Sequence, residues 1–166
     1  MNKFYNKLAD IRLVAFDVDG VFTDGRFYLS DNGVECKAFN TQDGFGIRRL
    51  ITADIAVAVI SGRKSGAVER RMTELGVPHL VQGCTDKVAA LDGIIEALGI
   101  SANECAYVGD DIPDLPLLKH VGVPIAVANA VEQVRAICDH TTTASGGFAA
   151  VREVCELVLS ARSNAA

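Results

Sequence analysis

Short apolar runs separated by longer helix-like segments constrain the fold of this 166-residue chain more than any other feature. Strands with helices on both faces read as unbroken apolar runs, whereas half-exposed strands alternate apolar and polar residues. We expect strands at residues 11–16, 55–60, 80–81, 105–108 and 124–127, with a last short one near 140–142. Helical patterns fill the intervals, at 43–53, 64–75, 85–98, 112–119, 131–138 and 148–161. This alternation predicts a three-layer α/β fold with a central parallel sheet.

Length and composition favour one domain over residues 1–166, with a C-terminal tail at about 144–166. The net charge is −5 and no basic block is present, so nucleic acid is not expected as a partner. Residues 1–10 lack the apolar core of a signal peptide, and the longest apolar run, 55–60, is too short to span a bilayer. We therefore expect a cytoplasmic protein without membrane contacts.

The five cysteines are widely spaced and form no Cys-x-x-Cys pair. An odd number excludes a complete disulfide framework, and the spacing argues against a zinc cluster. We expect buried, reduced thiols.

Residues 21–39 break the alternation, because they have no helical period and are too long for a simple loop. They contain Asn32-Gly33 between two strand-like runs, which is a strong signal for a β-hairpin. Apolar residues fall on both faces of the predicted ribbon, and a two-stranded ribbon is marginally stable alone. We expect it to pack on the domain or on another subunit.

Acidic residues follow two of the predicted strands. Asp17 and Asp19 come directly after the first strand, and Asp110 and Asp111 follow the strand at 105–108. The carboxyl ends of parallel strands share one edge, where ligands bind in such sheets. Converging carboxylates repel each other unless a cation joins them, and Mg²⁺ prefers oxygen ligands. The sequence therefore predicts a magnesium site at this edge, with a phosphate completing it.

These residue types suit phosphoryl transfer. Asp17 can attack phosphorus as a carboxylate nucleophile, and Asp19 can act as general acid and then as general base. Ser61 offers a hydroxyl and Lys87 a positive charge, and both can hold the transferring phosphoryl oxygens. Taken singly, Ser61 would be a helix N-cap and Lys87 a solvated helix residue.

The ordered pattern resembles the four motifs of the haloacid dehalogenase superfamily of phosphotransferases. The motifs are Asp17-Val-Asp19-Gly20, Ser61, Lys87 and Gly109-Asp110-Asp111-Ile-Pro-Asp114. The resemblance implies that Asp17 is the nucleophile and a Mg²⁺ ligand, that Asp19 is the acid/base with its carbonyl on the metal, and that Asp110 is the third protein ligand. Asp111 and Asp114 would lie beside these ligands.

Longer segments resemble the family of 3-deoxy-D-manno-octulosonate 8-phosphate (KDO 8-phosphate) phosphatases. They are residues 17–25, 39–48, 61–63, Arg71 and the tail at 146–153, although Ala149 stands where that family often has glycine. The family is capless and usually homotetrameric, with hairpins that form an intersubunit barrel. The intervals 20–40 and 62–83 leave no room for a lid domain. The resemblance implies substrate contacts from Asp19, Asn40, Thr41, Gln42, Asp43, Gly44, Arg48, Arg63, Arg71 and Lys87.

Two other functions remain open on the sequence. One is a related capless phosphatase for a nonulosonate 9-phosphate or another sugar phosphate. The other is a non-catalytic tetramerisation module beside a nucleotidyltransferase, although a scaffold has no need for the Asp17/Asp19 pair. In each of the pairs Arg48/Arg49 and Arg70/Arg71, at least one member is expected to be a plain surface residue, since adjacent helix residues face different ways.

Overall fold

The computed structural model describes residues 3–165. Its core is a six-stranded parallel sheet in the order β5-β4-β1-β6-β7-β8. The strands are β1 (Leu13–Phe16), β4 (Ala56–Ser61), β5 (His79–Gln82), β6 (Cys105–Gly109), β7 (Val123–Ala126) and β8 (His140–Thr141). The central strand, β1, is buried along its whole length, as its unbroken apolar run predicts.

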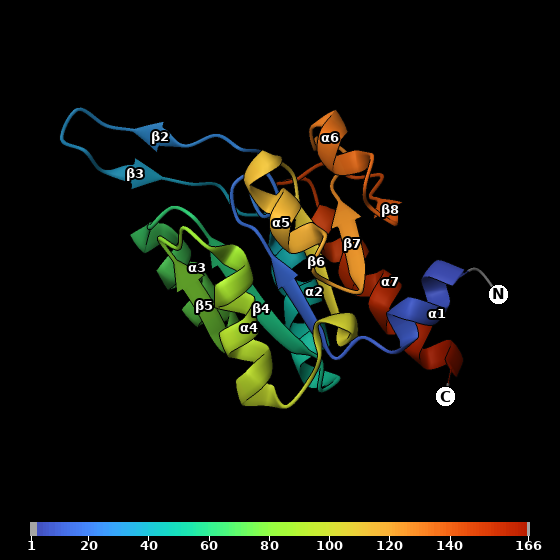
Figure 1. Ribbon diagram of the computed structural model, residues 1–166. Helices are drawn as coiled ribbons and strands as arrows, with labels where there is room; N and C mark the ends of the chain where they lie inside the picture. Colours follow the sequence, from blue (N-terminus) through green and yellow to red (C-terminus); the bar gives the residue numbers. More distant parts are fainter. Residues whose placement is uncertain (1–2, 166) are drawn as a thin grey trace.

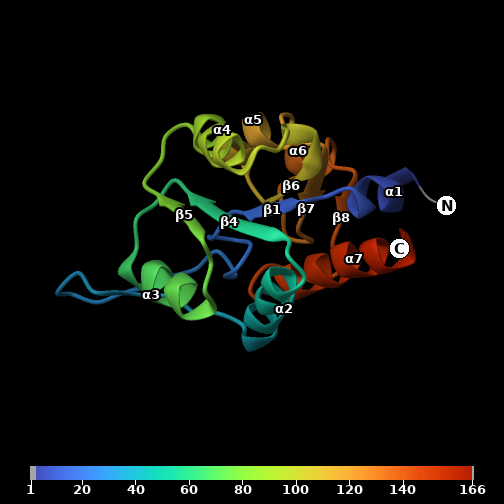
Figure 2. The ribbon, with the colours of Figure 1, turned by 90° about the horizontal axis from the view of Figure 1, so that it is seen from below.

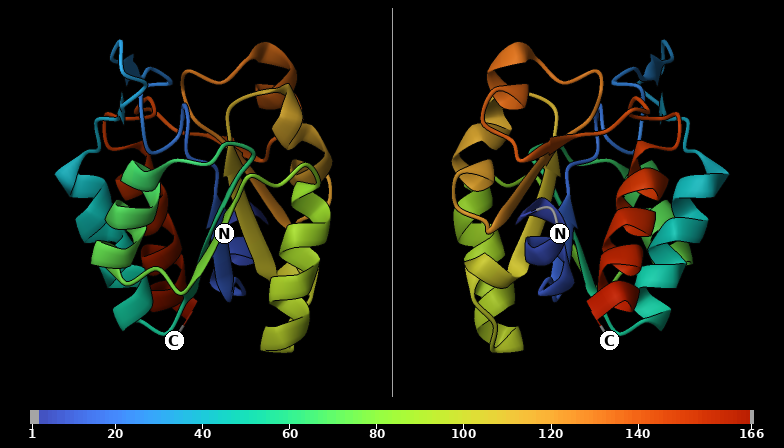
Figure 3. Two further views of the ribbon diagram at one scale, coloured as in Figure 1. Left: turned by 90° about the vertical axis from the view of Figure 1, so that its left-hand side faces the viewer. Right: turned by 90° about the vertical axis from the view of Figure 1, so that its right-hand side faces the viewer.

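Helices cover both faces of the sheet. They are α1 (Lys3–Ala9), α2 (Thr41–Thr52), α3 (Gly66–Leu75), α4 (Lys87–Leu98), α5 (Leu115–Leu118), α6 (Glu132–Arg135) and α7 (Ala150–Ala165), with 3₁₀ turns at Ala102–Glu104 and Ile112–Asp114. Figures 2 and 3 show α2, α3 and α7 on one face and α4, α5 and α6 on the other. None of the helices in residues 3–165 combines the length and apolar character that a bilayer crossing requires.

The three-layer α/β prediction is confirmed, and each expected strand is present within two residues of its bounds. Two features differ from expectation. The helix α1 was not predicted, because only Phe4 and Leu8 of its seven residues are buried and the segment reads as polar and mixed. The cysteines are not uniformly buried, since Cys36 is exposed on the hairpin.

The hairpin between β1 and α2 projects away from the domain (Figure 1). Its ladder is short, with β2 (Tyr28–Leu29) paired antiparallel to β3 (Glu35–Cys36). Ser30 and Val34 close a three-residue loop in which Gly33 has a φ of 81°, a left-handed conformation that glycine tolerates best. No cap domain interrupts residues 3–165.

Candidate active site

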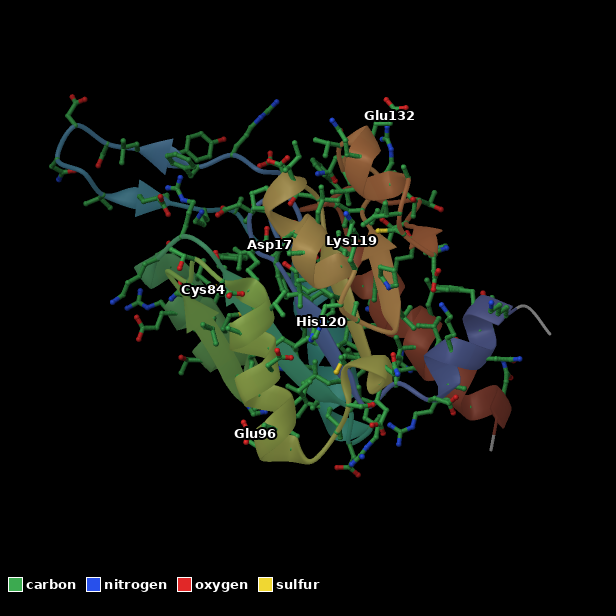
Figure 4. All side chains as sticks on the ribbon, viewed as in Figure 1. Asp17, Cys84, Glu96, Lys119, His120 and Glu132 are labelled. Carbon is green, nitrogen blue, oxygen red and sulfur yellow. The ribbon has the colours of Figure 1, made fainter. Side chains whose placement is uncertain are left out.

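The strand register brings the acidic motifs together. Phe16 of β1 pairs with Val59 of β4 on one side and with Val108 of β6 on the other. The next residue, Asp17, donates its backbone N–H to the Val108 carbonyl at 3.0 Å, so its side chain lies beside the start of the Asp110 loop. From β1 the chain continues to β4 on one side and later returns to β6 on the other side of β1. Such switch points in the strand order are where α/β sheets bind ligands. Asp17 lies at this end of the sheet in Figure 4, at the opposite end from Glu96.

A buried cation holds two of the carboxylates. Lys87, the first residue of α4, is 8% exposed. Its Nζ donates to Asp17 Oδ1 at 2.9 Å, to Asp114 Oδ1 at 2.7 Å and to the Tyr107 hydroxyl at 3.2 Å. The Tyr107 hydroxyl in turn donates to Asp114 Oδ1 at 2.6 Å. Lys87 is therefore fixed from three sides, with its charge directed at the Asp17 carboxylate.

Asp110 completes a triangle of acidic groups. Carboxylate oxygens of Asp17, Asp110 and Asp114 lie within 4.8 Å of one another. Asp110 Oδ1 is buried and has no hydrogen-bond partner among the described residues. Gly20, with a φ of 86°, lets the Asp110 carboxylate approach, because a Cβ at this position would lie 2.0 Å from Asp110 Oδ2. An unpartnered buried carboxylate oxygen beside a second carboxylate fits a divalent cation with oxygen ligands.

The pKa values of two carboxylates at this edge of the sheet are raised, because the groups are buried and lie close to other carboxylates. Burial, together with the nearby Asp114 carboxylate, raises the pKa of Asp17 to about 6, although Lys87 opposes the shift. Burial, together with Asp17, Asp114 and Asp111, raises the pKa of Asp110 to about 8. A cation between the two groups would reverse both effects, because it stabilises the ionised carboxylates.

Asp114 differs from the other two carboxylates because the protein already occupies its oxygens. Oδ1 accepts from Lys87 and Tyr107, while Oδ2 accepts the backbone N–H groups of Asp110 at 2.9 Å and Asp111 at 3.2 Å. Its role in the structure is to hold the Asp110 loop and Lys87 in place. A metal ion would thus find free oxygens on Asp17 and Asp110 rather than on Asp114.

These groups line an open pocket of about 310 Å³. Its lining residues are Asp17, Asp19, Gly25, Ser61, Gly62, Arg63, Lys87, Asp110, Asp111, Pro113 and Asp114. Ser61 is the last residue of β4 and its Oγ accepts the Arg63 backbone N–H at 3.3 Å. It is not a helix N-cap, since Ser65 precedes α3 and β4 extends further than the apolar run suggested.

The remaining substrate candidates lie elsewhere on the chain. Asn40 caps α2, with Oδ1 accepting the Gln42 N–H at 2.8 Å and Nδ2 donating to the Gly147 carbonyl of the tail at 3.2 Å. Thr41, Gln42, Asp43 and Gly44 form the first turn of this helix. None of these residues lines the pocket around Asp17.

Two of the predicted substrate-binding arginines do not line that pocket, and both contact Glu74 of α3. Arg48 donates to the Glu74 carbonyl at 2.9 Å, and Arg71 forms an ion pair with the Glu74 carboxylate at 2.9 Å. Arg49, which neighbours Arg48, pairs with Glu156 on α7. Within one chain, the residues predicted to bind substrate thus form two separate groups.

Sequence reasoning did not single out three residues that shape the site. Lys37 forms an ion pair with Asp19, Tyr107 contacts Lys87, and Asn129 donates to the Gly20 carbonyl at 3.0 Å while accepting from the Gly146 N–H at 2.6 Å. A signal for Tyr107 was its hydroxyl inside an otherwise apolar strand, since a buried hydroxyl requires a partner. Lys37 and Asn129 reach their partners across long sequence separations and carry no local signal.

The comparisons with known proteins agree with one another. Residues 77–151 match the haloacid dehalogenase-like hydrolase family. A 3-deoxy-D-manno-octulosonate 8-phosphate phosphatase of Escherichia coli K12 is 47% identical over 94% of this chain and 83% of its own length.

Solved structures agree with this match. The Moraxella catarrhalis phosphatase of the same name, in complex with a magnesium ion, a phosphate ion and a KDO molecule, has a TM-score of 0.96 at 48% identity, covering 99% of this chain and 94% of that one. The cobalt-bound phosphatase of Haemophilus influenzae has a TM-score of 0.91 at 40% identity, covering 95% of this chain and 92% of that one.

Proposed function

The chain belongs to the haloacid dehalogenase-like hydrolases, within the family of KDO 8-phosphate phosphatases, and we propose that it hydrolyses KDO 8-phosphate to KDO and inorganic phosphate with Mg²⁺ as cofactor. The reaction would serve lipopolysaccharide precursor synthesis. The observation that carries the proposal is the sheet-edge pocket, where Asp17 lies between the Lys87 ammonium and the unpartnered oxygen of Asp110.

In this proposal Asp17 is the nucleophile. Its carboxylate attacks phosphorus, the bond from phosphorus to the sugar oxygen breaks, and an aspartyl-phosphate forms. Asp19 gives a proton to the departing sugar oxygen and then takes one from the water that hydrolyses the intermediate. Lys87 and Ser61 line the same pocket and would hold the phosphoryl oxygens. Asp17, the Asp19 carbonyl and Asp110 would hold Mg²⁺, which neutralises phosphoryl charge.

The second group of predicted contacts would reach the substrate from another subunit. Arg63 lines the pocket, but Arg48, Arg71 and the turn at 40–44 do not. We propose a homotetramer, assembled through the 21–39 hairpin, that brings this group to a neighbour's pocket. The exposed apolar side chains on the hairpin support an interface there. Arginine suits the substrate carboxylate, because its planar fork pairs with two oxygens.

Replacement of Asp17 by Asn tests the nucleophile assignment. The variant keeps the shape of the side chain but loses its nucleophilic charge, so phosphate release should fall by at least about a thousandfold. The measurement is Mg²⁺-dependent phosphate release from KDO 8-phosphate, with EDTA as the metal-free arm. Unchanged turnover in this variant would refute the assignment, and a wild type without turnover would favour the scaffold function.

Further measurements test the finer parts of the proposal. The kcat/KM value should be higher for KDO 8-phosphate than for a nonulosonate 9-phosphate. A higher value for the nonulosonate 9-phosphate would identify that compound as the substrate instead. Sedimentation velocity should give a tetramer, and cell fractionation should place the protein in the cytoplasm. A single cooperative unfolding transition would support one domain over residues 1–166.

A further inference from the structure

We propose that Lys37, on the hairpin, is a positioning residue that holds the carboxylate of Asp19 in place for proton transfer. This inference rests on the proposed phosphatase function, in which Asp19 is the acid. It assigns a role to the hairpin within its own chain, in addition to any contact with a neighbouring subunit.

The contacts of Lys37 lead directly to the proposed acid. Its Nζ forms an ion pair with Asp19 Oδ1 and lies 3.5 Å from Glu35 Oε1. Glu35 also binds the Arg63 guanidinium at 2.6 Å, and Arg63 Nε lies 3.9 Å from Asp19 Oδ2. Two cations and two carboxylates therefore form one network between the hairpin and the rim of the pocket.

Both cations of this network also lie over the aromatic ring of Phe27. The Arg63 guanidinium lies 4.3 Å from the centre of the Phe27 ring, and Lys37 Nζ lies 5.5 Å from it. The hairpin backbone thus fixes the position of Lys37 with an aromatic contact as well as an ion pair.

The burial of Lys37 separates this arrangement from an ordinary surface ion pair. Its side chain is 0% exposed, although the hairpin around it is largely in water. Removing an ammonium group from water and fixing a four-carbon side chain both cost free energy. A solvated pair with Glu35 alone would avoid that cost. The free-energy cost of burying Lys37 is offset only if both Glu35 and Asp19 are its partners.

This geometry determines how Asp19 can act. Lys37 does not line the pocket, so its effect on the reaction passes through Asp19, which does. With Oδ1 held by Lys37, Oδ2 is the oxygen available to exchange a proton. When Asp17 attacks phosphorus, the bond from phosphorus to the sugar oxygen breaks, its electron pair goes to that oxygen, and the proton comes from Asp19.

Substrates with different leaving groups separate this role from a structural one. An alkoxide must be protonated as it leaves, whereas nitrophenolate leaves without a proton. Lys37→Met should therefore lower kcat/KM for KDO 8-phosphate by about ten- to a hundredfold, and for p-nitrophenyl phosphate by about threefold or less. Lys37→Arg keeps a cation beside Asp19 and should recover part of the loss on KDO 8-phosphate alone.

Lys64→Met is the matched control, because it removes the same charge from an exposed site between β4 and α3. It should leave both kcat/KM values within about twofold of the wild type, as expected for a surface change. Thermal unfolding and Mg²⁺ titration of every variant check that the fold and the metal site persist.

The outcomes distinguish this inference from the proposed function. A wild type that hydrolyses both phosphates, with Lys37→Met losing equally on the two or no more than Lys64→Met, overturns only the role of Lys37. A wild type that hydrolyses neither overturns both. A wild type that hydrolyses p-nitrophenyl phosphate and another sugar phosphate, but not KDO 8-phosphate, changes the substrate. The same comparison of Lys37→Met is then made on that sugar phosphate.

Discussion

The carboxyl edge of the sheet and the hairpin both hold charged side chains, but they do so in contrasting surroundings. At the sheet edge, Lys87 is 8% exposed and its partners Asp17 and Asp114 are at most 9% exposed. On the hairpin, the side chain of Lys37 is 0% exposed, although Tyr28 and Leu29 of the same ribbon are 73% and 66% exposed. The first site is positioned by the core, whereas the second depends on contacts between the ribbon and the domain. The two regions should therefore respond differently to matched substitutions.

Lys87→Met should have the largest effect on stability. It leaves the buried carboxylates of Asp17 and Asp114 without their cation, so the free energy of unfolding should fall by about 3–5 kcal/mol. The matched change Lys37→Met also removes a buried cation, but its partners Asp19 and Glu35 are 25% and 20% exposed and can be rehydrated, so it should cost only about 1 kcal/mol. Urea unfolding in EDTA measures both. Equal losses would contradict the contrast between a core-positioned site and a ribbon-positioned one.

Asp43→Asn should have an intermediate effect that depends on pH. Asp43 is 1% exposed, its Oδ1 accepts the Arg152 N–H at 2.9 Å, and its Oδ2 has no hydrogen-bond partner among the described residues. Burial raises its pKa to about 6, although the Arg152 N–H and the charges of Arg152 and Arg71 oppose this.

The sign of this pH dependence follows from the raised pKa. Between about pH 4 and pH 6 the folded chain keeps a proton on Asp43 that the unfolded chain has lost, so folding stability decreases as pH rises. The wild type should lose about 3 kcal/mol over this window through Asp43, and the Asn variant should not. The measurement is urea unfolding at several pH values, with the exposed hairpin residue Asp31→Asn as control. If the difference in the free energy of unfolding between Asp43→Asn and the wild type does not widen as pH rises, the raised pKa of Asp43 is contradicted.

Leu29→Ser should have the smallest effect on the fold. The side chain is exposed in the single chain, so at concentrations where subunits dissociate the free energy of unfolding should change by about 0.5 kcal/mol or less. Leu50→Ala, in the core, should cost about 2–5 kcal/mol. In sedimentation velocity, Leu29→Ser should shift the proposed tetramer towards smaller species. An unaltered tetramer would place the interface away from the hairpin.

Much of the fold was accessible from local pattern, for reasons visible in particular elements. The run Ile-Ala-Val-Ala-Val-Ile has no polar face and therefore predicts a strand covered on both sides, which β4 confirms. Gly76 and Gly99 end α3 and α4 in left-handed conformations, as glycines after helical patterns predict. The hairpin followed from Asn32-Gly33. Helix α1 escaped prediction because two buried residues make too weak a period.

The candidate site was only partly accessible in the same way. Asp17, Asp110 and Lys87 stand at strand or helix ends, and parallel pairing alone brings such ends to one edge. The contact of Arg48 with the Glu74 carbonyl depends on how α2 packs against α3, which no local pattern specifies, whereas Arg71 and Glu74 lie three residues apart on α3 itself. The pairing of Lys37 with Asp19 depends in the same way on the course of the whole hairpin.

The sequence alone determined which segments are strands and which of their ends carry the carboxylates, because backbone geometry and apolar period act over a few neighbouring residues. Tertiary structure alone decided that Asp114 is saturated by the protein while Asp110 keeps a free oxygen. It also decided that Ala149 adopts a φ of 75°, a left-handed conformation that costs alanine about 1–2 kcal/mol. Hydrogen bonds and charges act over a few ångströms, so their partners are set by packing between residues that lie far apart in the chain.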